Sequence, residues 1–157
     1  MVALLYVFDT SSLVELFKFY PKRFPSLFKA FDEIVADGQL ISVRECYREI
    51  EERADTLTDW AKANKSVFHD LTPAEAQAVA EIFKIKHFQQ SLEQKKLLKG
   101  GPFADPFLIA KGKVLGTAVV TQEKGKPNAA KIPNICAHFS VESMNLEMFM
   151  EAEDWTF

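Results

Sequence analysis

The sequence contains little cysteine and no hydrophobic run long enough to cross a membrane. Its first apolar run is broken by Asp9 and lacks a basic start, so it predicts neither a signal peptide nor a membrane span. Cys46 and Cys136 are the only two cysteines. Two thiols are too few for a disulfide framework in a chain of this size and fit a reducing compartment. We therefore expect a cytoplasmic protein with no membrane partner.

Several common motifs for cofactors and metals are also missing. The six glycines form neither a Walker loop nor a dinucleotide fingerprint, which excludes the usual nucleotide-cofactor interpretations. The histidines at 69, 87 and 138 lack the spacing of zinc ligands, and no Cys-x-x-Cys pair accompanies them. The formal net charge of −3 argues against a protein that coats nucleic acid, because such a protein needs a broad basic surface. It does not exclude an enzyme that binds nucleic acid locally through bound metal.

The composition is that of a single globular domain. The chain has 157 residues, 48% of them hydrophobic and 26% charged, which is enough to bury a core without disulfides. Apolar runs predict strands at residues 4–8, 40–43 and 117–121. Helix signals predict helices at about 13–20, 27–38, 45–60, 73–88, 105–112 and 144–151, with a loop at 122–131 and a turn around Pro133. Ser12 and Thr72 are the expected N-caps of the first and fourth of these helices. Strands that alternate with helices, without hairpin signals, predict an α/β fold with a parallel sheet.

Four acids fall at the ends of predicted strands or at the starts of predicted helices: Asp9, Glu49, Asp105 and Glu123. In an open α/β sheet such positions converge on one crevice, where ligands bind. Clustered carboxylates repel one another unless they hold a cation, and hard divalent ions such as Mg²⁺ and Mn²⁺ prefer oxygen ligands. Glu45 is an alternative to Glu49, because the two lie four residues apart and share a helix face.

Helix capping is a competing interpretation for two of these acids. Asp9 precedes a predicted helix, and Asp105 precedes Pro106, so either carboxylate could serve as an N-cap alone. Capping does not explain Glu123, which follows a strand. Just after it, Lys124 and Lys126 flank a glycine, and this basic loop predicts either a phosphate contact or a solvated turn.

The segments 6–13, 49–50, 104–110 and 120–123 occur in the order found in PIN domains, and the chain resembles the small, single-domain VapC-type toxins of toxin–antitoxin pairs. The resemblance implies a three-layer α/β fold over residues 1–157, with a central parallel sheet flanked by helices. It also implies a metal-dependent ribonuclease whose partners are an RNA substrate, a cognate antitoxin and, in a homodimer, a second copy of the chain.

By the same resemblance, Asp9, Glu49, Asp105 and Glu123 are expected to hold Mg²⁺ or Mn²⁺ and to carry catalysis. Ser11 and Thr121 are expected as their polar neighbours. Glu123 departs from the family, where the fourth acid is commonly aspartate, so its ligation is expected to be water-mediated or the second metal to be weakly bound. That departure keeps open a different function, a catalytically silent PIN-fold module that acts through protein association.

Two other α/β families also place an aspartate after the first strand. Haloacid-dehalogenase phosphatases need a second aspartate two residues on, where this chain has Ser11. Receiver domains usually carry an acidic pair at that strand end, whereas Asp9 stands alone. The segment 17–24 interleaves basic and aromatic residues, which predicts either RNA contact or rings packed inward, and the second is the more frequent arrangement.

Overall fold

A computed structural model describes residues 5–157. Five strands form one parallel sheet in the order β3-β2-β1-β4-β5. The strands are β1 (Tyr6–Phe8), β2 (Leu40–Val43), β3 (Phe68–His69), β4 (Ala118–Val120) and β5 (Ser143–Met144). The central strand is β1, whose Tyr6 is in register with Leu40 of β2 and Ala118 of β4. The three predicted strands are confirmed, although Leu4 lies outside the described residues.

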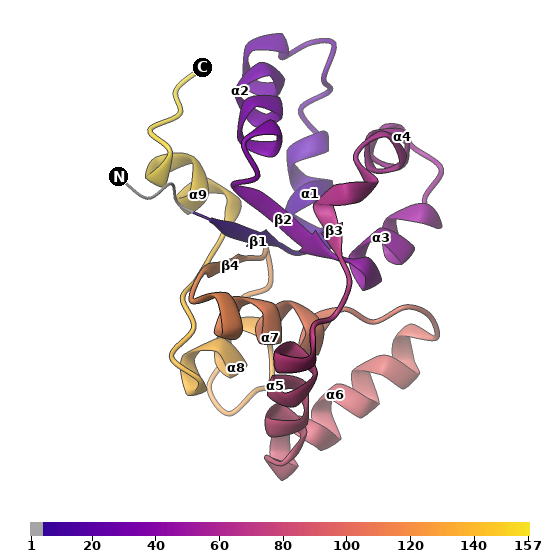
Figure 1. Cartoon of the computed structure of the whole chain (residues 1–157), viewed down its shortest axis with the longest axis vertical. Coiled ribbons are helices and arrows are strands. Elements are labelled where there is room, and N and C mark those ends of the chain that lie inside the picture. The colour runs from indigo at the N-terminus through magenta and orange to yellow at the C-terminus, as the bar shows by residue number, and fades with distance from the viewer. Residues whose placement is uncertain (1–4) are drawn as a thin grey trace.

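Helices cover both faces of this sheet (Figure 1). On one face lie α1 (Thr10–Phe17), α2 (Pro25–Ala36), α3 (Arg44–Glu51), α4 (Thr56–Ala63) and α9 (Leu146–Ala152). On the other lie α5 (Pro73–Phe83), α6 (Lys86–Lys99), α7 (Asp105–Leu115) and α8 (Ile132–His138). A short 3₁₀ turn, η1 (Lys65–Val67), leads into β3. The expected three-layer α/β fold with a central parallel sheet is therefore confirmed.

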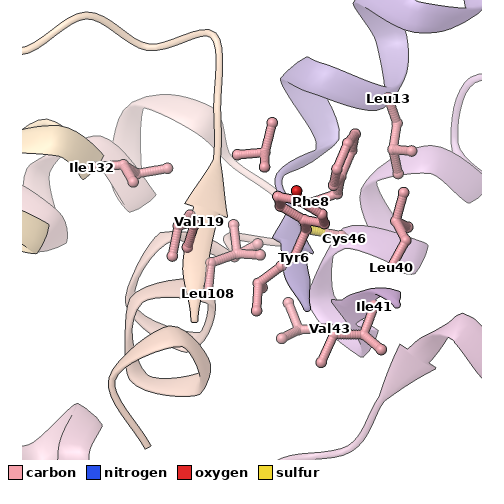
Figure 2. Packing of buried hydrophobic residues seen from close by; sticks show 14 of the residues in the cluster. Tyr6, Phe8, Leu13, Leu40, Ile41, Val43, Cys46, Leu108, Val119 and Ile132 are labelled. Carbon is pink, nitrogen blue, oxygen red and sulfur yellow. The ribbon is translucent and has the colours of Figure 1, made fainter. Parts of the chain in front are cut away.

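The core lies on both faces of the sheet, around the central strand β1 and its neighbour β4 (Figure 2). Every residue of these strands is buried, which explains why they read as unbroken apolar runs in the sequence. On the α9 side, the ring of Phe149 meets Tyr6 and Phe8 edge-on, with centroid distances of 4.7 and 4.9 Å. On the other side, Leu108 of α7 packs beneath Val119.

Helix α7 lies so close to β4 that only a glycine fits at the point of contact. A Cβ built on Gly112 would stand 2.7 Å from Val119 Cγ2 and 3.2 Å from the carbonyl oxygen of Thr117. The expectation that this helix ends near Gly112 was wrong, because the glycine serves this close approach. The helix continues to Leu115 and ends at Gly116, which has a φ of +65°.

The first helix begins earlier than expected. It starts at Thr10, so Asp9 is the N-cap residue and Ser12 is buried inside the first turn. The expected capping role of Ser12 was therefore wrong. The helix also ends at Phe17, before the expected Tyr20, whose φ of +51° is not helical.

The helix expected through Trp60 is two helices, because a turn separates α3 from α4. Ala54 has a φ of +55°, which ends helical geometry there. Asp55 then opens α4 with a capping box, since its Oδ1 accepts from Thr58 N at 3.1 Å and Thr58 Oγ1 accepts from Asp55 N at 3.2 Å.

The helix expected to reach Phe88 ends at Phe83, and α6 begins at Lys86 after Ile85, whose backbone is extended. Its predicted N-cap is confirmed, because Thr72 Oγ1 accepts from Glu75 N at 3.2 Å. Most of α6 was not predicted. It ends at Gly100, whose φ of +67° ends helical geometry there.

The last part of the chain contains two short elements that the sequence did not reveal, β5 and α8. The turn expected around Pro133 is the start of α8. The last helix begins at Leu146 and not at Met144, which belongs to β5, because Asn145 Oδ1 caps it by accepting from Met148 N at 2.8 Å.

Both cysteines are free and buried. Within residues 5–157, none of the helices combines the length and the apolar character that crossing a bilayer requires.

Candidate active site

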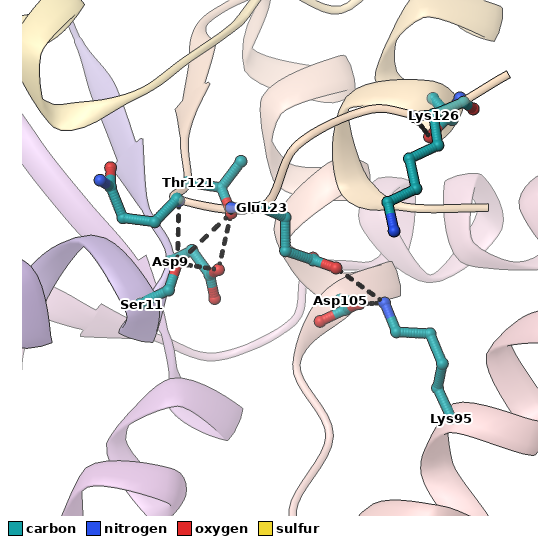
Figure 3. Close-up of polar contacts among 9 residues, drawn as sticks. Asp9, Ser11, Lys95, Asp105, Thr121, Glu123 and Lys126 are labelled. Atoms are coloured by element: carbon teal, nitrogen blue, oxygen red, sulfur yellow. Dashed lines mark hydrogen bonds and ion pairs between the residues drawn. The ribbon is translucent and has the colours of Figure 1, made fainter. Parts of the chain in front are cut away.

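Asp9 stands at the carboxyl end of the central strand, where β1 turns into α1. Its backbone N–H continues the hydrogen bonding between β1 and β4, because it donates to the carbonyl oxygen of Val120 at 2.8 Å. Its side chain makes no capping hydrogen bond to α1. Instead, carboxylate oxygen Oδ2 accepts from Ser11 Oγ at 2.7 Å and from Thr121 Oγ1 at 2.8 Å (Figure 3). The capping interpretation therefore does not account for the side chain of Asp9.

The charge of Asp9 is held in a buried position, with only 7% of the residue exposed. Burial raises the pKa of this carboxyl to about 6, and the negative charges of Asp105 and Glu123 add to the increase. The hydrogen bonds from Ser11 and Thr121 act in the opposite direction, because they stabilise the charged form. The three acids thus lie close enough to repel one another.

The same two hydroxyls fix the loop that follows β4. Ser11 Oγ accepts from the backbone N–H of Gln122 at 3.0 Å, and Thr121 Oγ1 accepts from that of Glu123 at 3.2 Å. Each hydroxyl therefore donates to Asp9 and accepts from the neighbouring chain turn. Ser11 and Thr121, expected as polar neighbours, tie the ends of β1 and β4 together and so set the position of Glu123.

Asp105 is the first residue of α7, and its carboxylate does not cap that helix. It meets a lysine instead. Lys95 Nζ of α6 lies 2.5 Å from Asp105 Oδ2 and 3.1 Å from Glu123 Oε1, and thus bridges the two acids (Figure 3). Burial alone would lower the pKa of Lys95, but the attraction of Asp105 and Glu123 outweighs it and raises that pKa.

Glu49 lies on α3, beside the start of α1. Its Oε1 accepts from Thr10 Oγ1 at 3.3 Å, and its Oε2 forms an ion pair with Lys99 Nζ. Glu45 instead lines a separate hollow with Arg48 and Phe103. Of the two rival acids, Glu49 is therefore the one that contacts the residue next to Asp9.

The arrangement is not a closed metal site. Within residues 5–157, no three aspartate, glutamate, histidine or cysteine side chains are placed to hold one ion together. The donor chemistry nevertheless suits a hard divalent cation, because the carboxylates of Asp9, Asp105 and Glu123 lie near one another and both hydrogen bonds to Asp9 go to Oδ2. Oδ1 of Asp9 receives no hydrogen bond from the described part of the chain, so its lone pairs are free for a ligand.

The loop after Glu123 carries both expected lysines, Lys124 and Lys126, in exposed positions. The backbone of Lys126 is held by Asn134, whose side chain makes hydrogen bonds of 3.2 and 2.6 Å with it. Figure 3 shows the Lys126 side chain reaching toward Lys95 and Glu123. Its side chain therefore lies on the same side of the site as those of Lys95 and Glu123.

In the basic and aromatic segment 17–24, some rings pack inward and others are exposed. Phe17 packs inward against Phe28 and Trp60. Tyr20 and Phe24 are exposed, 68% and 44% respectively.

Sequence reasoning missed three residues of this site: Thr10, Lys95 and Lys99. The two lysines lie four residues apart, which places them on one face of α6. That spacing was visible in the sequence, but without a helix assigned to residues 86–99 it carried no signal.

A model of the family described as "Domain of unknown function (DUF4411)" matches residues 6–157. No curated protein matches the chain. Among solved structures, the chain is similar to the one described as "Crystal structure of PAE2754 from Pyrobaculum aerophilum", with 15% sequence identity and a TM-score of 0.46. That match covers 96% of this chain and 97% of the other. Neither description names an activity.

Proposed function

The chain belongs to the DUF4411 family, whose description names no activity, and we propose from its site that it is a metal-dependent endoribonuclease of PIN-like fold. The observation that carries the proposal is the environment of Asp9. A buried carboxylate with one free oxygen, held by two hydroxyls and facing two further acids, costs stability unless it serves a ligand. A divalent cation is the ligand that such a site fits best.

In this proposal Asp9, Asp105, Glu123 and Glu49 hold Mg²⁺ or Mn²⁺ and so form the catalytic site. Such an ion supplies a Lewis acid for the phosphodiester and lowers the pKa of the attacking water. Ser11 and Thr121 keep the Asp9 carboxylate in one orientation. Lys126, and Lys124 beside it, would contact phosphate groups of the RNA at the rim.

The test is cleavage of a fluorescent single-stranded RNA by purified protein with Mn²⁺, with Mg²⁺ and with EDTA. We expect cleavage with either ion and none with EDTA. Asp9→Asn and Asp105→Asn should each abolish it, because each variant loses one charged ligand. The matched control is Asp37→Asn, an exposed acid at the end of α2, which should cleave at the wild-type rate. Full activity in a folded Asp9→Asn protein would refute the assignment.

We further propose that the enzyme is the toxin of a toxin–antitoxin pair and acts in the cytoplasm. The support is the VapC-type resemblance together with two ion pairs of these acids. Lys95 pairs with Asp105, and Lys99 pairs with Glu49. An antitoxin arginine would pair with Asp9 or Asp105 in the same manner. Gentle purification from the native host, followed by mass spectrometry, should recover a small partner. Recovery of free monomer or homodimer alone would contradict this part.

A second candidate function is a catalytically silent binding module. The observation that favours it is that the acids already have counter-charges, since Lys95 and Lys99 pair with three of the four. Calorimetric titration with Mn²⁺ separates the two functions, because a silent module has no need to bind the ion.

A further inference from the structure

A hollow of about 520 Å³ lies beside the candidate active site, between α3, α5 and the start of α7. It borders the site because Phe103 and Pro106, which line it, stand on either side of Asp105 in the chain. Its wall is largely apolar, since it also contains the rings of Phe83 and Phe107. The volume falls within the range of about 300–1,000 Å³ that small-molecule sites occupy. We call this site the phenylalanine hollow.

Two cations that line the phenylalanine hollow have no counter-charge. Arg48 of α3 and Lys96 of α6 are exposed, and neither forms an ion pair within residues 5–157. By contrast, Lys95 and Lys99 on the same helix α6 are both paired. Aromatic rings beside unpaired cations are the combination with which proteins bind single-stranded nucleic acid, because bases stack on the rings and phosphates pair with the cations.

The acid in this wall is Glu45, which is half-buried. It forms no ion pair within residues 5–157, although Arg48 follows three residues later on the same helix. Its carboxylate would repel a phosphate group, but it can accept a hydrogen bond from the amino group of a base, as glutamate does from N4 of cytosine. Uracil has a carbonyl oxygen in place of that amino group. Glu45 therefore favours cytosine over uracil inside the hollow.

A second hollow adjoins the first along α3, because Arg48 lines both. Arg44 and Tyr47 line it from the same helix face, since they lie four and one residues before Arg48. Lys65 Nζ stands 5.3 Å from the centre of the Tyr47 ring, so a cation already covers that ring. Arg44 pairs with Asp70 at 3.3 Å, but both side chains are more than half exposed, and such pairs contribute little. This basic hollow therefore suits phosphate groups better than a base.

We propose that the two hollows together bind a single strand of RNA. One unpaired base enters the phenylalanine hollow, where Glu45 contacts its amino group, and the phosphate groups lie at Arg48, at Lys96 and in the basic hollow. In a duplex, stacking covers the faces of the base and pairing occupies its edge, so the site selects single-stranded RNA. The choice of RNA rests on the proposed ribonuclease function, whereas the binding itself requires no metal.

The experiment measures binding of fluorescein-labelled oligocytidine and oligouridine by fluorescence anisotropy in EDTA, where no metal-dependent cleavage occurs. We expect the wild type to bind oligocytidine roughly tenfold more tightly than oligouridine, because one base contact is lost with uracil. It should bind an RNA duplex more weakly than oligocytidine. Glu45→Gln should remove most of the preference for cytidine, because the amide can also donate to O4 of uracil.

Two surface variants test the phosphate contacts. Arg48→Met and Lys96→Met should each weaken oligocytidine binding roughly tenfold at about 50 mM salt and reduce the slope of log K against log salt by about 0.7, because each loses one phosphate. The matched control is Lys62→Met, an exposed lysine of α4 that lines neither hollow. Wild-type affinity in both variants, or an equal loss in the control, would overturn the inference.

The stacking contact is tested by Phe107→Leu, which removes the ring and keeps most of its apolar volume. Oligocytidine should bind on the order of five- to a hundredfold more weakly, as when a stacked base loses its ring. The matched control is Phe24→Leu, because Phe24 is an exposed ring that lines neither hollow. A folded Phe107→Leu protein with wild-type affinity would contradict the inference. If that protein does not fold, the two surface variants still decide.

Cleavage assays with Mn²⁺ on the same proteins separate this inference from the proposed function. Binding that prefers cytidine, without any cleavage, would support the two hollows and refute the nuclease. Metal-dependent cleavage with an unchanged KM in Arg48→Met and Phe107→Leu would support the nuclease and refute this RNA path. A wild type that binds neither oligonucleotide would overturn the inference. Loss of a co-purifying protein from Arg48→Met would then assign the hollows to a protein partner instead.

Discussion

At the scale of single residues, the site is governed by what surrounds Asp9. Its carboxylate is almost removed from water, yet it lies near two other acids and receives two hydrogen bonds at the same oxygen. Burial and like charges raise the pKa of Asp9, and the hydrogen bonds lower it by less. This balance makes the stability of the metal-free protein depend on pH and on individual side chains.

We expect Asp9→Asn to stabilise the metal-free protein at pH 7.5. The pKa of Asp9 rises from 3.8 to about 6 on folding, so the folded protein holds this proton more tightly between those values. The free energy of unfolding of the wild type should therefore fall as the pH rises from about 4 to about 6, by roughly 3 kcal/mol, and then level off. Urea titrations in EDTA across this range should show the fall in the wild type only.

The control for that prediction is Asp37→Asn, which should follow the wild-type pH profile within about 0.5 kcal/mol. If Asp9→Asn were less stable than the wild type at pH 7.5 in EDTA, the carboxylate would stabilise the fold. It would then not be a metal ligand whose buried charge destabilises the metal-free protein.

Thr121→Val should destabilise the fold by about 1–2 kcal/mol, because the valine leaves Asp9 without one donor and Glu123 N without its acceptor. It should also raise the pKa of Asp9 further, since the Thr121 bond lowers it. Thermal melts at several pH values measure both effects. The matched control is Thr117→Val, near the start of the same strand. Thr117 Oγ1 is buried without a partner within residues 5–157, so the same change there should be neutral or stabilising.

At the scale of elements, helix α7 connects the site to the core. It begins at Asp105 and packs against β1, β2 and β4, while α5 lies along its outer side. Two features hold it in place. Gly112 faces β4, and Lys111 forms a buried ion pair with Glu75 of α5. A substitution at each position tests its contribution to stability.

Gly112→Ala should destabilise the protein by about 1–3 kcal/mol, although alanine favours helices, because its methyl group has no room against Val119 and Thr117. The helix must then move away from β4 and take Asp105 with it. Chemical denaturation measures the loss. Gly101→Ala is the control, since its Cβ would come no closer than 3.9 Å to the carboxylate of Glu52. Equal effects at both positions would contradict the packing explanation.

The second feature is the pair of Lys111 and Glu75, whose side chains are 3% and 2% exposed and whose Nζ and Oε1 lie 2.9 Å apart. Lys111→Met should cost about 3–5 kcal/mol, because it leaves a charged carboxylate buried without a partner. The double variant Lys111→Met with Glu75→Leu removes both charges and should recover most of that loss. Urea titrations of the wild type, the single variant and the double variant measure both changes. A double variant no more stable than the single one would show that the pair contributes more than charge balance.

At the scale of the whole molecule, metal binding should appear as added stability. An ion that binds only the folded state stabilises it by RT ln(1 + [L]/Kd), about 2.7 kcal/mol when the free ion is at a hundred times its Kd. Mn²⁺ should therefore raise the melting temperature of the wild type well above its value in EDTA. The same excess should shift Asp9→Asn far less. Equal shifts of both proteins would place the ion somewhere other than the site at Asp9.

The sequence by itself determined the α/β class, the three long strands and the positions of Asp9, Asp105 and Glu123 at strand ends or helix starts. These features depend on local patterns, since an apolar run that stops at a polar residue marks a buried strand and its end. Proline and capping signals located the starts of α5 and α7 in the same way.

Only the tertiary structure decided which groups meet in the crevice. Glu49 and Glu45 have the same local pattern, and their different surroundings come from the packing of α3 beside α1. Lys95 and Lys99 reach the acids because α6 lies across the crevice, and no short-range signal encodes that placement. Likewise, Gly112 looked like a helix end until the distance to β4 was known. Such contacts join residues far apart in the chain, so they follow from packing and not from local propensity.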